Sequence, residues 1–264
     1  MIVWTVANQK GGVGKTTTVV SLAGILAQRG QRVLLIDTDP HASLTAYLDF
    51  DSDRLDGTLY ELFQAVKPTA ELVNKLTLKT KFENINLLPA SITLATLDRV
   101  MGNREGMGLV LKQALLRIQE QYDYVLIDCP PVLGVMMVNA LAACDRILVP
   151  VQTEFLALKG LERMMKTFEI MQRSKRDKFR YTVIPTMFDK RTRASLMTLK
   201  SIKDQYGDSV WNAVIPIDTK FRDASLLHIP PSIYSPGSRG TYAYETLLNH
   251  LDALERQRVH EVTA

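Results

Sequence analysis

The sequence predicts one α/β domain, with a mostly parallel central sheet and helices on both faces. Three observations lead to this prediction. Strand-like and helix-like segments alternate along all 264 residues, a glycine-rich turn joins the first strand to the first helix, and no linker-like segment or internal repeat divides the chain. With 46% hydrophobic and 23% charged residues, the composition is that of an ordinary globular protein.

The chain begins with a short apolar run, which predicts the strand Ile2–Asn8. After a turn, apolar residues recur at helical spacing and predict the helix Lys15–Gln28. Gly30 is placed to end that helix, because glycine readily adopts the left-handed conformation that follows many helices. The continuous apolar run Val33–Asp37 then predicts a strand that is buried on both faces.

The remaining elements continue the alternation. Apolar runs bounded by turn residues predict the strands Ile85–Pro89, Tyr124–Asp128, Arg146–Val151, Arg180–Pro185 and Val210–Ile215. Apolar residues at helical spacing predict the helices Leu59–Ala65, Thr69–Leu76, Leu109–Gln121, Val135–Ala143, Leu158–Met171, Ala194–Tyr206 and Thr241–Arg256. We therefore expect one domain over residues 1–256 and a polar, frayed tail over residues 257–264.

The charge and the cysteines limit the classes of function. The net charge of +4 and the pI of about 9.0 permit contact with nucleic acid without requiring it. Cys129 and Cys144 form neither a metal-binding spacing nor a disulfide framework, which fits a reducing cytoplasm. We expect no signal peptide, because Met1 leads straight into a strand-like run, and we find no run of about 18 apolar residues that would span a bilayer.

The stretch Lys10–Thr17 reads Lys-Gly-Gly-Val-Gly-Lys-Thr-Thr and lies between the first strand and the first helix. Its glycines allow backbone N–H groups to turn inward, and together with the helix N-terminus these groups form a cradle for phosphates. Lys15 is placed to reach β- and γ-phosphate oxygens, and the Thr16 hydroxyl is placed to bind Mg²⁺. The residues expected to bind a nucleotide are Gly11, Gly12, Val13, Gly14, Lys15, Thr16 and Thr17.

Three aspartates follow predicted strands. Asp37 and Asp39 stand at the end of Val33–Asp37, and Asp128 ends the apolar run Tyr124–Asp128 in a Walker B pattern. In open α/β sheets, ligands bind beyond the carboxyl ends of the strands, so we expect these carboxylates near the phosphate loop. Asp128 would hold Mg²⁺ directly or through water.

With a second lysine, Lys10, at the start of the loop, the sequence resembles the deviant Walker A motif of the ParA/MinD family of ATPases. Asp37-Thr38-Asp39-Pro40 is similar to the second motif of that family, and the resemblance extends over the whole chain. It implies a deviant P-loop NTPase fold, an ATPase with ATP and Mg²⁺ as cofactors, and a homodimer that forms with ATP.

The resemblance also implies roles for single residues. Lys10 would reach across the dimer to the partner's nucleotide, Asp39 would position or activate the attacking water, and Asp37 would support the shell of Mg²⁺ ligands. Lys10, Lys15 and Asp39 are thus the expected catalytic residues. The family often continues with Gln-Gly-Asn where this chain has His41-Ala42-Ser43, and we expect His41 to be a loop residue rather than a catalytic base.

Two further sets of residues follow from the resemblance. Met187, Pro216 and Asp218 occupy places where family members contact adenine. Arg191 and Lys220 match positions where family members bind DNA without sequence preference, through contacts that would be driven by phosphate and sensitive to salt. Their neighbours of the same charge are Arg193 and Arg222. The alternative for these basic residues is a solvated charged face that binds nothing.

Several stretches, among them Leu88–Ser91 and Val149–Glu154, are similar to the ParA-like proteins of bacterial chemotaxis clusters. This resemblance implies a cytoplasmic spatial switch, on the nucleoid or at a pole, that positions chemoreceptor arrays and hydrolyses ATP slowly until a partner protein stimulates it. Two alternatives stay open: a chromosome or plasmid partitioning ATPase that works with a centromere-binding protein, and a nucleotide-gated adaptor with negligible hydrolysis. We expect no direct membrane binding, because Leu251–Ala264 lacks a continuous apolar face.

Overall fold

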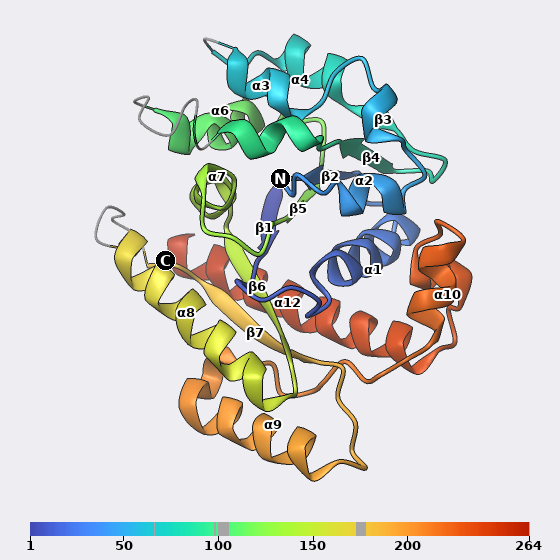
Figure 1. Cartoon of the computed structure of the whole chain (residues 1–264), viewed down its shortest axis with the longest axis vertical. Coiled ribbons are helices and arrows are strands. Elements are labelled where there is room, and N and C mark those ends of the chain that lie inside the picture. Colours follow the sequence, from blue (N-terminus) through green and yellow to red (C-terminus); the bar gives the residue numbers. More distant parts are fainter. Residues whose placement is uncertain (66, 98, 100–105, 173–177, 264) are drawn as a thin grey trace.

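One central sheet of seven described strands organises the molecule (Figure 1). The structure is a computed structural model, and it describes residues 1–263 except 66, 98, 100–105 and 173–177. The strands are β1 Ile2–Val6, β2 Val33–Asp37, β3 Leu78–Lys79, β4 Ile85–Leu88, β5 Tyr124–Asp128, β6 Arg146–Gln152 and β7 Tyr181–Thr186. Their order is β3-β4-β2-β5-β1-β6-β7, with β3 antiparallel to β4 and the other pairs parallel. The predicted fold class is confirmed.

Helices cover both faces of the sheet (Figure 1). The described helices are α1 Lys15–Gln28, α2 Ser43–Tyr47, α3 Leu59–Gln64, α4 Ala70–Leu76, α6 Val110–Arg117, α7 Val135–Ala143, α8 Phe155–Gln172, α9 Arg193–Tyr206, α10 Lys220–Leu226, α11 Pro231–Tyr234 and α12 Arg239–Thr263. Apolar residues of α1, α2 and α12 share one core with the sheet, and those of α3, α6, α7 and α8 share the other. None of the described helices is long and apolar enough to cross a bilayer.

Side chains of β1 divide between the two cores because successive residues of a strand point to opposite faces. Trp4 and Val6 pack with α1 and α12, whereas Val3, and Ala7 just after the strand, pack with the opposite layer. All residues of β2 are buried, as expected for a parallel strand covered by helices on both sides. Because β5 pairs with both β1 and β2, the carboxyl ends of these three strands lie side by side.

Val210–Ile215 is not a strand, which corrects the prediction. Trp211 N donates to Val183 O and Ile215 N donates to Pro185 O, so both ends of the segment contact β7. The two bonded residues of the segment are four positions apart, whereas their partners in β7 are only two positions apart. The residues between Trp211 and Ile215 therefore bulge away from β7 and form no regular strand pairing with it. Only the isolated bridges Val183 to Val210 and Phe188 to Pro216 form there.

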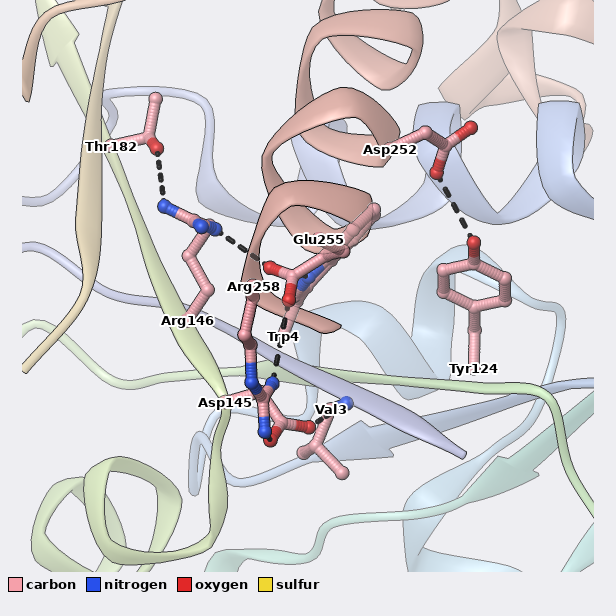
Figure 2. A network of polar contacts seen from close by, with 9 residues as sticks. All are labelled: Val3, Trp4, Tyr124, Asp145, Arg146, Thr182, Asp252, Glu255 and Arg258. Carbon is pink, nitrogen blue, oxygen red and sulfur yellow. Dashed lines mark hydrogen bonds and ion pairs between the residues drawn. The ribbon is translucent and has the colours of Figure 1, made fainter. Parts of the chain in front are cut away.

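The closing helix is longer than predicted. It runs from Arg239 to Thr263, past the expected end at Arg256, and the region expected to be frayed contributes contacts. Figure 2 shows α12 against the amino-terminal edge of the sheet, where Arg258 pairs with Asp145 at 2.7 Å. Glu255 pairs with Arg146 at 2.8 Å, and both side chains are less than a tenth exposed. The helix is thus fixed to the sheet by charges as well as by apolar packing.

Candidate nucleotide-binding site

The phosphate loop connects β1 to α1 in a conformation that requires glycine. Gly12 and Gly14 have φ values of 72° and 92°, in the left-handed region that side chains other than glycine rarely adopt. Apart from the adjacent residues, no atom of the described chain lies within 4 Å of the position that a Cβ would take at Gly11, Gly12 or Gly14. The loop therefore borders open space in front of the N-terminus of α1, as a phosphate cradle must.

One contact anchors this loop to the sheet, and a second spans the loop itself. The Thr186 hydroxyl, at the end of β7, donates to Val13 O at 2.9 Å, and Val13 is fully buried. Lys15 is also buried, and its Nζ donates to Lys10 O at 3.0 Å across the loop. Burial lowers the pKa of Lys15, and the negative charges of Asp128 and Asp39 oppose that shift. A phosphate would add an anionic partner to this enclosed cation.

Asp128 and Asp37 end neighbouring strands and are directly paired in the register of β2 with β5. The Thr16 hydroxyl donates to Asp128 Oδ2 at 2.5 Å, whereas Asp128 Oδ1 is buried and has no hydrogen-bond partner in the described chain. Burial, reinforced by the charge of Asp37, raises the pKa of Asp128 to about 8. A cation at Oδ1 would give this buried oxygen a partner and would stabilise the ionised carboxylate. Thr16 and Asp128 therefore fit a Mg²⁺ ion.

The described residues contain no cluster of three or more His, Cys, Asp or Glu that could hold a metal by itself. Magnesium does not require such a cluster, because proteins commonly hold it through one or two carboxylates together with substrate phosphates and water. The chemistry of the donor set, a hydroxyl beside a carboxylate, is the one expected for a metal that bridges phosphates.

Asp37 also forms hydrogen bonds within the fold that the sequence does not reveal. Its Oδ2 accepts hydrogen bonds from Thr45 N and the Thr45 hydroxyl, both at 2.8 Å, and its Oδ1 accepts one from Asp39 N at 3.1 Å. Burial raises the pKa of Asp37 to about 6. The carboxylate thus fixes α2 and the turn that presents Asp39, and it lies beside Asp128 as predicted.

Asp39 lies on that turn, with its side chain mostly buried. Its Oδ1 accepts a hydrogen bond from His41 N at 3.0 Å and lies 2.9 Å from His41 Nδ1. Lys10, at the opposite side of the loop, pairs with Glu154 of the same chain at 3.6 Å. Gly160 of α8 lies against this part of the loop, where an added Cβ would stand 3.0 Å from Lys10 Cβ. The structure thus gathers Lys10, Lys15 and the predicted aspartates around one loop.

Comparison with known proteins gives the family. A family model described as an AAA domain matches residues 1–181. The sporulation initiation inhibitor protein Soj of Bacillus subtilis is 34% identical over 94% of this chain and 97% of Soj. The chromosome partitioning protein ParA of Caulobacter vibrioides is 36% identical over 96% of this chain and 94% of that ParA. The chain belongs to the ParA/MinD family.

A solved structure supports the ParA/MinD fold. It is a Mycobacterium smegmatis protein named cobyrinic acid a,c-diamide synthase, crystallised with an ATP analogue and magnesium. It is 35% identical to this chain and superposes with a TM-score of 0.81 over 95% of this chain and 94% of that protein.

The ParA/MinD loop opens beside a cavity of about 650 Å³. Met187, Pro216 and Asp218, predicted to contact adenine, all line it, together with Gly14 and Thr17 of the loop. The cavity has the size of a small-molecule site. Its other lining residues include Gln152, Phe221, Arg222 and Tyr244. No motif identifies these residues in the sequence, because they come from separate elements that only the fold brings together.

The basic residues predicted to bind DNA are exposed, and two of them have acidic partners. Arg191 pairs with Asp189 at 2.7 Å, and Lys220 pairs with Asp223 at 3.2 Å. Arg193 opens α9 and Arg222 lies on α10, both exposed. The local carboxylates offset part of the positive charge at Arg191 and Lys220.

Proposed function

We propose that this protein binds ATP with Mg²⁺, forms a homodimer around the nucleotide, and hydrolyses ATP slowly until a partner protein stimulates the reaction. The observation that best supports this proposal is the convergence of Lys15, Thr16 and Asp128 beyond the ends of β1 and β5, with Asp128 Oδ1 buried and unpartnered. Lys15 and the loop amides would bind the phosphates, Thr16 and Asp128 would hold the metal, and Asp39 would position the attacking water. The metal, when bound, neutralises charge on the phosphates.

Exposed apolar side chains beside the loop support the homodimer. Val132 and Leu133 follow β5, and Phe155 and Leu156 begin α8 after β6, so all four lie at the carboxyl edge of the sheet. Each is about half or more exposed, from 49% at Leu133 to 68% at Phe155. Apolar side chains grouped near a site commonly mark an interface. A second copy would cover them and bring its own Lys10 to the nucleotide.

Chromosome or plasmid partitioning is the process that we propose for this switch. The relative ParA of Caulobacter vibrioides supports it, because that protein is named for chromosome partitioning. The partner would be a DNA-bound protein, and the anchor would be nucleoid DNA held through Arg191, Arg193, Lys220 and Arg222. Chemoreceptor arrays are the second candidate cargo, favoured by the stretches Leu88–Ser91 and Val149–Glu154.

Sedimentation of the purified protein tests the switch. We expect a monomer without nucleotide, a dimer with ATP and Mg²⁺, and a further shift onto duplex DNA that weakens as salt rises. The double variant Arg191→Glu with Lys220→Glu should keep the ATP-dependent dimer and lose the shift onto DNA. A dimer that ignores DNA would refute the nucleoid anchor, and a protein that stays monomeric with ATP would refute the proposed dimer.

Phosphate release separates an ATPase from an adaptor that only binds nucleotide. We expect slow release by the wild type and none by Asp39→Ala, which should remain an ATP-bound dimer. Equal release by the two proteins would remove Asp39 from the mechanism.

A further inference from the structure

The turn after β2 brings the side chains of His41 and Asp39 together. His41 Nδ1 lies 2.9 Å from Asp39 Oδ1, and the backbone N–H of His41 donates to the same oxygen at 3.0 Å. Any residue at position 41 would keep the backbone contact, because it belongs to the turn. The imidazole contact depends on the side chain at position 41.

We propose that His41 is a positioning residue, which orients the Asp39 carboxylate for the hydrolysis of ATP. This inference rests on the function proposed above. When Nδ1 carries a hydrogen, the imidazole donates it to Oδ1, and the His41 backbone N–H donates to the same oxygen. Within the described chain Asp39 Oδ2 accepts no hydrogen bond, so it stays available to a water molecule at the phosphate site.

Hydrogen bonds fix the backbone of Asp39, so the orientation of its carboxylate depends on the rotation of its side chain. Asp39 N donates to Asp37 Oδ1 at 3.1 Å, and Ala42 N donates to Asp39 O at 2.8 Å. Ala42 has a φ of 52°, in the left-handed region that alanine rarely adopts. Sparsely populated backbone conformations are concentrated at functional sites, where the surroundings hold them in place.

The position of Asp39 gives this orientation a chemical consequence. The negative charge of Asp39 contributes a rise to the pKa of Lys15 and to the pKa values of Asp37 and Asp128. Asp39 is therefore electrostatically coupled to the phosphate-binding cation and to the metal-binding carboxylate. A carboxylate free to rotate away from this group would lose its contact with an attacking water, whereas nucleotide binding by Lys15 and the loop would remain.

The exposure of His41 makes a substitution interpretable. Its side chain is 80% exposed, while that of Asp39 is 14% exposed. Removing the imidazole therefore leaves no internal cavity, and the fold should persist. A change in activity can then be assigned to the contact with Asp39.

Steady-state ATP hydrolysis by wild type, His41→Leu and His41→Asn tests the inference. Asparagine can place an amide N–H where Nδ1 stands, whereas leucine cannot donate. We expect His41→Leu to lower kcat by about fivefold, the effect of one hydrogen bond of about 1 kcal/mol, with KM unchanged. His41→Asn should keep kcat within about twofold of the wild type. The affinity for a fluorescent ATP analogue should be equal in all three proteins.

Three results would overturn the inference. One is an unchanged kcat in His41→Leu, and another is a loss in His41→Asn as large as in His41→Leu. The third is a rise in KM with an unchanged kcat, because it would place His41 in binding. A wild type that hydrolyses no ATP, alone or with its partner, would instead refute the proposed function, and the inference with it.

Discussion

Lys15 shows how a single residue is prepared for a ligand. Its ammonium lies inside the protein, with the Lys10 carbonyl at 3.0 Å as its hydrogen-bond partner. The negative charges of Asp128 and Asp39 stabilise its charged form, against the burial that lowers its pKa. An incoming phosphate replaces part of the hydration that the fold removed, so binding should depend strongly on this one side chain.

Lys15→Ala should reduce ATP affinity by at least about 100-fold, because two charge-assisted hydrogen bonds of about 1.5–3 kcal/mol each are lost. Isothermal titration with ATP and Mg²⁺ measures the change. Lys112→Ala, at an exposed position on α6, is the control and should bind like the wild type. Tight binding by Lys15→Ala would contradict the assigned role.

Asp123 and Arg32 give a pH dependence remote from the site. Arg32 donates to Asp123 from Nε at 3.1 Å and from Nη2 at 2.8 Å, and these hydrogen bonds lower the pKa of Asp123 to about 2. The folded pKa lies below the unfolded value of about 3.9, so the carboxylate stabilises the fold at neutral pH and this contribution is lost as the pH falls from about 4 to 2.

Arg32→Leu should therefore lower the free energy of unfolding at pH 7, and the difference from the wild type should shrink towards pH 2. Chemical denaturation at a series of pH values measures it. If the difference in unfolding free energy between Arg32→Leu and the wild type grew as the pH fell, Arg32 would not stabilise the ionised form of Asp123.

The residues of the loop and the three aspartates are predictable from the sequence because each follows a strand at short, fixed spacing. Their partners are not. Asp37 bonds Thr45, and Phe221 and Tyr244 line the cavity beside Gly14, although nothing local in the sequence relates them. The contact between His41 and Asp39 also escapes prediction, since it depends on the rotamer of an exposed side chain.

At the scale of elements, α10 and α12 meet beside the cavity through a close contact. Gly240, in the first turn of α12, leaves room for the Phe221 ring, which stacks edge-on with Tyr244 at 5.7 Å between ring centroids. A Cβ at Gly240 would lie 2.3 Å from Phe221 Cζ and under 3.0 Å from two more ring atoms. The ring would have to move, and it lines the cavity.

Gly240→Ala should lower the free energy of unfolding by about 1–3 kcal/mol, the usual cost of overpacking, and weaken ATP binding. Thermal denaturation and titration with ATP measure the two effects. Gly237→Ala is a matched control, because no atom lies within 4 Å of the position of its Cβ. If Gly240→Ala kept wild-type stability and ATP affinity, the Phe221 ring could move aside without cost, which would contradict this prediction.

Among the elements, long periodic segments such as α1 are predictable, and short ones are not. α10 has one buried residue, Ala224, and hence no apolar period to detect. Val210–Ile215 has the composition of a strand, but its contacts with β7 are spaced too far apart for a ladder. In both segments tertiary contacts decide the backbone conformation, and local propensity does not.

At the scale of the whole molecule, a network of charged side chains joins α12 to β1 and β6 (Figure 2). Glu255 Oε1 accepts hydrogen bonds from Arg146 Nε at 2.8 Å and from Trp4 Nε1 at 3.4 Å. Asp145, paired with Arg258, accepts one from Val3 N at 2.9 Å. Because Arg146 and Glu255 are both buried, each charge depends on the other.

Glu255→Ala should lower the free energy of unfolding by about 3–5 kcal/mol, because it leaves the Arg146 guanidinium buried without a counter-charge. Urea denaturation measures this. The double replacement of Arg146→Met with Glu255→Leu should recover much of the loss, and Glu169→Ala, at an exposed position on α8, should have little effect. A minor effect of Glu255→Ala would show that Arg146 reaches solvent when unpaired.

The bond between Trp4 and Glu255 joins residues 251 apart. During synthesis on a ribosome, at about 5–20 residues per second, Trp4 and the first strand therefore wait roughly 10–50 s for their partner in the last helix. Until α12 emerges, the core side of β1 that it covers stays open on the nascent chain. Early strands of this protein should accordingly be substrates for chaperones at the tunnel exit, and the emergence of α12 should be the event that closes this side of the sheet.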